Sequence, residues 1–287
     1  MKTSTDFTAL TVPTQFADVN GTAFAYRRFG KKQNLPLVLL QHFTGTLENW
    51  DPYVLDGISK NREVIIFDNR GVAGTGGETP DSIAAIAKDA IAFIDALGLE
   101  KIDLLGFSMG GMVAQQITLN RPELINRLIL VGTAPSGVRD IETFSPEVWA
   151  MFEKEYNQPD ELLLETLFTP SAASQKAGSQ FLNRIRERVV DRDSNITDKV
   201  APAQATAIAG WSQINRGNFD YLKLIKQPTL VVSGDSDIIF PTVNSVLLQQ
   251  NLPNAHLIIY PDSNHGALYQ YPNLFISQVS LFLEGVE

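Results

Sequence analysis

A serine enclosed by glycines is the feature of this 287-residue chain that most directly points to chemistry. Residues 106–111 read Gly-Phe-Ser-Met-Gly-Gly, after an apolar run at 102–105 and before a largely apolar segment at 113–119. These flanks predict a buried strand and a helix, the context of a nucleophile elbow, in which a tight turn exposes a serine hydroxyl. Glycines two residues either side of Ser108 omit side chains that would collide in such a turn. We therefore predict that Ser108 is a nucleophile at the start of a helix.

The base that would activate this serine must be a residue within hydrogen-bond reach, oriented in turn by an acid. The chain has three histidines, at positions 42, 256 and 265. We predict that His265 is the base, because it follows the last predicted strand, and loops at the carboxyl ends of parallel strands carry the chemistry of such sheets. His256 opens a predicted strand, so its side chain is interpreted as structural.

The acid is sought between the serine and the histidine, after an earlier strand. The segment 233–241 offers Asp235 and Asp237. Asp237 lies two residues further past the strand end, so we predict that it orients His265. Asp235 is predicted to brace the turn by accepting backbone N–H groups.

An acyl-transfer reaction also needs donors for the negative oxygen of its tetrahedral intermediate. The backbone N–H of Met109, the residue after the serine, is one predicted donor. The second is the N–H of Phe43, in the loop 41–46 after the first core strand. His42 is then expected to fix this loop rather than to transfer protons.

The elements that would position these residues alternate along the chain. Continuous apolar runs such as 37–40 and 128–131 are typical of central parallel strands buried on both faces. The alternation predicts a doubly wound, mostly parallel α/β sheet, preceded by an antiparallel hairpin around Asn20-Gly21. Strands are predicted at 12–18, 22–28, 36–41, 63–68, 102–106, 127–132, 229–234 and 256–260, and a helix at 82–97.

The alternation stops between about residues 133 and 226, where the pattern predicts helices at 146–156, 160–168, 171–190 and 199–214. We therefore predict a core made of 1–135 and 227–287, with 136–226 as an inserted helical unit of about the size of a small folding unit. Three arginines of the third helix, Arg184, Arg186 and Arg188, are expected on a solvated face.

The composition of the chain argues against several kinds of partner and cofactor. The net charge of −9 argues against nucleic acid and anionic membrane as partners. No run approaches the roughly 18 apolar residues of a membrane span, and the first residues lack the pattern of a signal peptide, so a cytoplasmic protein is expected. Cysteine is absent and no cluster has metal-ligand spacing, so we expect neither metal nor organic cofactor. A homo-oligomer is left open.

Five motifs occur in order: His42-Phe43-x-Gly45, residues 68–71, residues 106–111, Gly234-Asp235-x-Asp237 and residues 264–266. Together they resemble the α/β-hydrolase superfamily, and within it the capped, cofactor-free esterases and haloperoxidase-like hydrolases. The resemblance implies the fold, the triad of Ser108, Asp237 and His265, and an oxyanion hole with two donors. One departure is that the family usually has glycine where Phe43 stands.

The resemblance also implies that the helical insertion is a lid over Ser108 that lines an apolar pocket. Trp149, Phe152 and Phe168, from amphipathic segments of the insertion, are the predicted pocket residues. Related capped folds that attack halides or epoxides place aspartate at the elbow. The serine at position 108 therefore disfavours a dehalogenase or an epoxide hydrolase.

The predicted function is a serine hydrolase that cleaves a small, largely apolar carboxylic ester or lactone through an acyl-enzyme. The same triad also serves carbon–carbon bond hydrolases, acyltransferases and perhydrolases or haloperoxidases, and these alternatives stay open. A charged substrate would need a cation in the pocket, for which Arg70, Arg139 and Arg216 are the candidates. A small-ligand receptor of this fold is the alternative from another class.

Overall fold

The structure, a computed structural model, describes residues 7–138, 146–158, 161–213 and 218–285. Within them, eight strands form one sheet in the order β1-β2-β4-β3-β5-β6-β7-β8. The β1–β2 and β2–β4 pairs are antiparallel and the other pairs are parallel. This confirms the predicted fold class. The strands are β1 (Gln15–Val19), β2 (Thr22–Gly30), β3 (Leu37–Leu40), β4 (Glu63–Phe67), β5 (Ile102–Phe107), β6 (Ile125–Val131), β7 (Thr229–Gly234) and β8 (Ala255–Tyr260).

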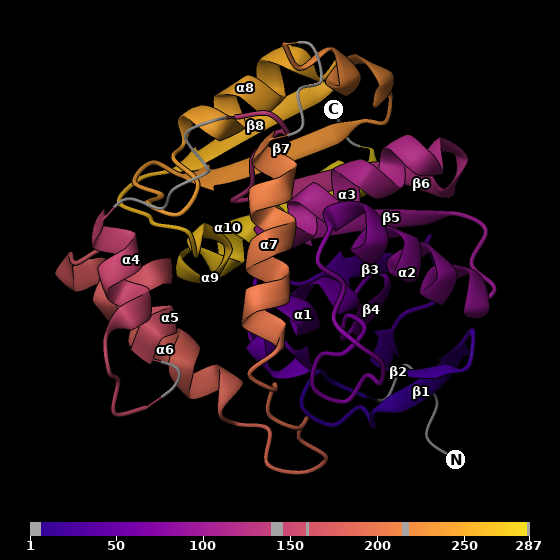
Figure 1. The fold of residues 1–287 in the computed structure, drawn as a ribbon, viewed down its shortest axis with the longest axis horizontal. Helices are drawn as coiled ribbons and strands as arrows, with labels where there is room; N and C mark the ends of the chain where they lie inside the picture. The colour runs from indigo at the N-terminus through magenta and orange to yellow at the C-terminus, as the bar shows by residue number, and fades with distance from the viewer. Residues whose placement is uncertain (1–6, 139–145, 159–160, 214–217, 286–287) are drawn as a thin grey trace.

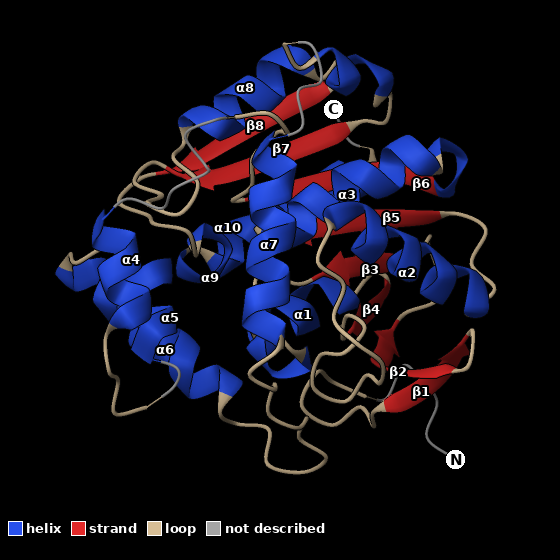
Figure 2. Ribbon diagram, in the orientation of Figure 1, coloured by secondary structure: helices blue, strands red, loops and turns tan. Residues whose placement is uncertain are grey.

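Helices cover both faces of the sheet, as Figure 2 shows. Side chains alternate along β3, so Val38 and Leu40 join one buried cluster while Leu37 and Leu39 join the other. The first cluster includes residues of α2, α3 and α8, and the second includes residues of α1, α9 and α10. These helices are α1 (Pro52–Ser59), α2 (Ile83–Ala96), α3 (Met109–Asn120), α8 (Val243–Asn251), α9 (Ala267–Gln270) and α10 (Pro272–Glu284).

The part of the segment between β6 and β7 that the structure describes contains helices and no strand. The helices are α4 (Pro146–Glu153), α5 (Glu161–Leu167), α6 (Ala172–Ile185) and α7 (Val200–Gln213). Figure 1 shows α4, α5 and α6 beyond the carboxyl ends of the parallel strands, with α7 crossing the front of the molecule. No helix among the described residues is long and apolar enough to cross a membrane.

The expectation that the arginines of the third inserted helix face solvent is wrong for two of the three. Helix α6 ends at Ile185, and Arg184 near its end donates to both carboxylate oxygens of Asp51, which is fully buried, with nitrogen–oxygen distances of 2.6–3.1 Å. Arg188 is 4% exposed and donates to the carbonyl oxygens of Ala9 and Val12. Arg186 alone of the three is exposed. Two of these guanidinium groups thus fasten the inserted helices to the core.

Candidate active site

The turn between β5 and α3 holds Ser108 in a strained conformation, with φ 57° and ψ −123°. This residue alone separates the strand from the helix, and the tight turn leaves no room for side chains at Gly106 and Gly110. A Cβ on Gly106 would lie 2.3 Å from the carbonyl oxygen of Gly110, and a Cβ on Gly110 would lie 2.2 Å from that of Leu40. The Ser108 N–H donates to the carbonyl oxygen of Val131 at 2.8 Å, which anchors the turn to the neighbouring strand β6.

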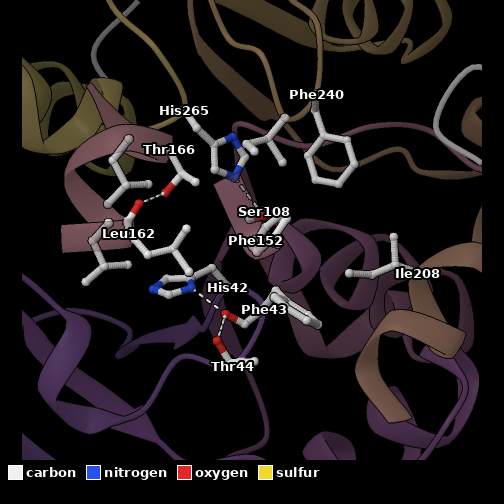
Figure 3. A pocket seen from close by; sticks show the side chains of 13 residues that line it. His42, Phe43, Thr44, Ser108, Phe152, Leu162, Thr166, Ile208, Phe240 and His265 are labelled. Carbon is white, nitrogen blue, oxygen red and sulfur yellow. Dashed lines mark hydrogen bonds between the residues drawn. The ribbon is translucent and has the colours of Figure 1, made fainter. Parts of the chain in front are cut away.

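Ser108, His265 and Asp237 come from three separate loops and form one chain of hydrogen bonds. The Ser108 Oγ lies 2.8 Å from His265 Nε2. A dashed line marks this hydrogen bond in Figure 3. On the other side of the ring, His265 Nδ1 lies 2.8 Å from Asp237 Oδ2. All three side chains are at most 5% exposed. The structure therefore brings together the three residues of the predicted triad, in the order that lets a carboxylate orient an imidazole toward a hydroxyl.

The loops that carry the acid and the base are tied to each other by backbone contacts. Asp237 Oδ1 accepts the N–H groups of Ile239 and Phe240 at 2.9 Å, which leaves Oδ2 for the histidine. Asn264 Oδ1 accepts the N–H groups of Ile238 and His265, so one amide side chain spans both loops. The Asn-His-Gly sequence pointed to this position, but its bridging role depends on a partner 26 residues away.

Asp235 has a different set of partners in the same region. Its Oδ2 accepts the N–H of Asp262 at 3.0 Å, and its Oδ1 accepts the N–H of Ser263 at 3.1 Å. The Asp235 carboxylate thus holds the loop that leads to His265, whereas the imidazole itself is bonded by Asp237. This is the backbone-bracing arrangement that its position in the sequence predicted.

The loop after β3 is held on both sides of Phe43. The His42 N–H donates to Gln41 Oε1 at 2.9 Å, and the Thr44 N–H donates to Gln204 Oε1 at 2.6 Å. Thr44 itself has a φ of 58°, an unfavourable value for a β-branched residue. Gln204 belongs to α7, 160 residues away, so the inserted segment contributes to the shape of this loop. No periodic pattern in the sequence marks Gln204, which is why it was not predicted.

The Phe43 carbonyl is fixed as well as the flanking amides. Its oxygen lies 2.8 Å from His42 Nδ1 and accepts a hydrogen bond from Thr44 Oγ1 at 2.7 Å. Burial lowers the pKa of His42 to about 4, an effect that the bond to the Phe43 carbonyl opposes and the charge of His265 adds to. A ring that is neutral and already donating to a carbonyl is suited to hold the loop, as the sequence predicted for His42.

An apolar cavity lies over Ser108, with about 550 Å³ of empty space that is partly open to solvent. Figure 3 shows its wall. The polar side chains of the wall are few: His42, Thr44, Ser108, Thr166 and His265. The apolar ones come from the core and from the inserted helices: Phe43, Phe152, Leu162, Leu163, Leu167, Ile208, Ile239 and Phe240.

The three predicted pocket residues of the insertion have different positions. Phe152 lines the cavity, and its ring stands edge-on to that of Phe43 with centroids 6.1 Å apart. Phe168 is 1% exposed and packs against Phe181 at 5.8 Å; it is not one of the residues that line the cavity, so its assignment to the pocket is corrected to a core position. The side chain of Trp149 lies outside the part of the chain that the structure describes.

Comparison with known proteins agrees with this geometry. Residues 36–272 match the family model described as the alpha/beta hydrolase fold. A solved alpha/beta hydrolase fold protein from Chitinophaga pinensis is 43% identical, with a TM-score of 0.91 over 97% of this chain and 99% of its own.

Two curated relatives have names that state a substrate. The poly(3-hydroxyalkanoate) depolymerase of Ectopseudomonas oleovorans is 30% identical over 83% of this chain and 80% of its own length. The 2-hydroxy-6-oxo-6-phenylhexa-2,4-dienoate hydrolase of Burkholderia cepacia is 26% identical over 76% of this chain and 71% of its own. The resemblance seen in the sequence motifs is thereby confirmed: the chain belongs to the alpha/beta hydrolase fold family, and it is a hydrolase.

Proposed function

We propose that this hydrolase is a serine hydrolase that cleaves a small, largely apolar carboxylic ester or lactone through an acyl-enzyme. The observation that carries the proposal is the unbroken series of hydrogen bonds from Ser108 Oγ through His265 to Asp237, at 2.8 Å each. A base that is already bonded to the hydroxyl, and already oriented by a carboxylate, is what a serine nucleophile requires.

In the first half of the reaction, Ser108 Oγ attacks the carbonyl carbon and its proton passes to His265 Nε2. Negative charge develops on the carbonyl oxygen, and the backbone N–H groups of Met109 and Phe43 are the proposed donors to it. Met109 is the first residue of α3, where backbone N–H groups have no partner within the helix. Collapse of the intermediate breaks the carbon–oxygen bond to the alcohol, which takes the proton from His265.

In the second half, a water molecule attacks the acyl-enzyme. His265 removes a proton from that water, the ester bond to Ser108 breaks, and Oγ recovers a proton from the imidazolium. The Asp237 carboxylate stabilises the positive ring in both halves and holds the Nδ1–H tautomer. The carboxylic acid product leaves, and the enzyme returns to its starting protonation state.

The inserted helices of 136–226 are part of this proposal as a lid over Ser108, joined to the core 1–135 and 227–287. Two contacts support it. The N–H of Gly266, next to the base, donates to the carbonyl oxygen of Leu167 in α5 at 2.8 Å. Phe152 of α4 meets Phe43 above the serine. A lid in this place would exclude water from the site and strengthen its electrostatic interactions.

The cavity favours an uncharged ester over an anionic substrate of a carbon–carbon bond hydrolase. None of its wall residues, as far as the structure describes them, is Lys or Arg. Arg70, one of the candidate cations, is paired with Asp89 at 2.9 Å, and Arg139 and Arg216 lie outside the described residues. Isolated carboxylates are costly to bury without a partner, so an apolar substrate is the better match.

The direct test is the hydrolysis of p-nitrophenyl butyrate by the wild-type protein and by Ser108→Ala. Loss of a triad nucleophile lowers turnover by about 10⁴-fold or more. We expect that loss with an unchanged melting temperature, since the serine hydroxyl has no structural partner besides His265 among the contacts described. Turnover by Ser108→Ala within tenfold of the wild type would contradict the proposal.

A further inference from the structure

The Nε2 of His42 is a buried polar atom beside the cavity. The His42 side chain is 8% exposed, and its Nε2 has no hydrogen-bond partner among the described residues. A buried polar atom without a partner destabilises the folded protein, so such an atom at the wall of a binding site calls for an explanation.

The chemical character of this atom follows from the other ring nitrogen. His42 Nδ1 lies 2.8 Å from the carbonyl oxygen of Phe43, and a carbonyl oxygen can only accept, so Nδ1 carries the proton. Burial lowers the pKa of the ring to about 4, which keeps it neutral near pH 7. The Nε2 of a neutral ring with a protonated Nδ1 holds a lone pair. It is therefore a hydrogen-bond acceptor and not a donor.

The position of His42 places this acceptor between two cavities. His42, Thr44, Leu162 and Leu163 line both the apolar cavity over Ser108 and a neighbouring cleft of about 1300 Å³, partly open to solvent. Most of the residues that line the cleft are polar or charged, among them Glu48, Asn49 and Arg192. In Figure 3 the ring edge that carries Nε2 points away from Phe43.

The ring also lies close to the reacting groups. Phe107 contacts both histidines, with ring centroids 5.4 Å from His42 and 5.1 Å from His265. Because His42, Ser108 and His265 all line the same cavity, a substrate held there can contact His42 as well as the reacting groups. Of the other residues that line both cavities, the two leucines have no side-chain donor, and the Thr44 hydroxyl donates to the Phe43 carbonyl oxygen instead.

We propose that His42 Nε2 is a substrate-binding acceptor, and that the preferred ester or lactone carries a hydroxyl or amide N–H near the scissile carbonyl that donates to it. This inference rests on the proposed serine hydrolase function and narrows its substrate class. A site that leaves a buried polar atom unpaired with the wrong substrate discriminates strongly against analogues that lack the donor. The apolar cavity then holds the carbon skeleton of the substrate, while His42 accepts a hydrogen bond from one polar group on it.

Two substitutions separate the two nitrogens of the ring. In His42→Asn, the side-chain amide nitrogen can take the place of Nδ1 and donate to the Phe43 carbonyl, while nothing occupies the place of Nε2. In His42→Gln, the longer side chain can place an amide oxygen where Nε2 was and so restore an acceptor.

The substrates are the methyl esters of butyrate, 2- and 3-hydroxybutyrate, and 2- and 3-methoxybutyrate. Their hydrolysis is measured by the release of acid. Each methoxy ester keeps the oxygen of its hydroxy partner and has a methyl group in place of the donor hydrogen.

The measured quantity is the ratio of kcat/KM for a hydroxy ester to that for its methoxy partner, which cancels any general effect of the substitution on catalysis. We expect a ratio of about ten or more for the wild type at one of the two positions, a ratio near one for His42→Asn, and substantial recovery in His42→Gln. Equal ratios in wild type and His42→Asn, or no preference in the wild type, would overturn the proposal.

If the wild type cleaves none of the esters, including methyl butyrate, the serine hydrolase function itself fails. If the wild type cleaves methyl butyrate but does not prefer the hydroxy esters to the methoxy esters, only the His42 proposal is contradicted.

A binding measurement gives the same answer without catalysis and without a substitution at His42. In Ser108→Ala, titration with methyl 3-hydroxybutyrate or methyl 2-hydroxybutyrate should move the ¹⁵N resonance of the His42 Nε2 upfield. An unprotonated ring nitrogen shifts in this direction when its lone pair accepts a hydrogen bond. Methyl butyrate should leave it in place. A resonance that all of these esters move equally, or that none of them moves, would contradict a donor bound at Nε2.

Discussion

Asp235 and Asp237 lie two residues apart in one loop and hold the same neighbouring loop at two different places. Asp237 bonds the imidazole of His265 at 2.8 Å, whereas Asp235 bonds the backbone N–H groups of Asp262 and Ser263. One carboxylate therefore acts on the ring and the other on the chain that carries the ring. The pair provides a comparison in which the same substitution should have two different effects.

The first prediction is that Asp237→Asn lowers kcat for p-nitrophenyl butyrate by about 10³–10⁴-fold, because an amide favours the wrong tautomer of the histidine. Asp235→Asn is the matched control, and we expect it to lower the melting temperature by a few degrees while turnover stays within about tenfold of the wild type. Steady-state kinetics and thermal melts of both variants check this. Equal losses of turnover in the two variants would show that Asp237 has no special role.

The second prediction concerns Gln204, which holds the Thr44 N–H from α7 and so helps to fix the loop of Phe43. If the Phe43 amide serves the oxyanion, a looser loop weakens an interaction that is strongest in the transition state. Gln204→Met, similar in volume, should lower kcat by about tenfold with little change in KM. Gln213→Met, at an exposed position of the same helix, is the control. A rise in KM at unchanged kcat would mean that Gln204 shapes the pocket rather than the loop.

The third prediction separates two phenylalanines of the insertion. Phe152 lines the cavity, whereas Phe168 is buried against Phe181. Phe152→Ala should shift the preferred acyl length toward longer p-nitrophenyl esters, since it enlarges the cavity. Phe168→Ala should instead lower the free energy of unfolding by roughly 3–5 kcal/mol and leave the length preference as it is. Rates across an acetate-to-decanoate series, together with denaturant melts, distinguish the two. An unchanged preference in Phe152→Ala would count against a selective lid.

The fourth prediction is a pH effect on stability at Asp68, a fully buried residue whose Oδ1 accepts the Leu47 N–H at 2.9 Å. Burial raises the pKa of Asp68 well above its ordinary value. A hydrogen bond to the Asp193 carboxyl and its charge add to this shift, against the opposing effects of the Leu47 N–H and Arg27. A pKa raised by folding means that the bound proton stabilises the native state at low pH. That contribution is lost as the pH rises through the folded pKa.

Asp193→Asn should weaken this dependence, because it removes the charge of Asp193 and lets an amide N–H bond Asp68, whereas the part of the pKa shift that burial causes remains. We expect the melting temperature of the variant to exceed that of the wild type increasingly between pH 5 and pH 9. Asp198→Asn, an exposed carboxylate of the same connecting segment, is the control. Melting curves of wild type and Asp193→Asn that stay parallel across this range would contradict the shared proton.

The sheet could be predicted from the sequence because its signals are local. Runs such as 37–40 are apolar without interruption, which is the mark of a strand buried on both faces, and all four residues are at most 2% exposed. The helix predicted at 82–97 has local start and stop signals: Ser82 caps its start, and Gly98 follows its end with a φ of 68°. The elbow and the loops of Asp237 and His265 follow strand ends, so their meeting at one edge follows from the fold.

The features that the sequence did not predict depend on contacts between distant segments. Arg184 was assigned to solvent because its partner, Asp51, lies 133 residues away. Phe168 and Phe152 both belong to apolar stripes, and only the way that the inserted helices dock decides which of them faces the cavity. Gln204 carries no local signal at all. The pattern of residue types therefore could not predict which distant residues pair or how the inserted helices dock on the core.

The central claim, that Ser108 is the nucleophile of an acyl-enzyme, is tested most directly by ethyl p-nitrophenyl butylphosphonate, which phosphonylates activated serines and releases one nitrophenolate. We predict one equivalent of nitrophenolate per chain, a matching mass increase on the peptide that contains Ser108, and no reaction in Ser108→Ala. An adduct on any other residue, or equal labelling of Ser108→Ala, would contradict the account.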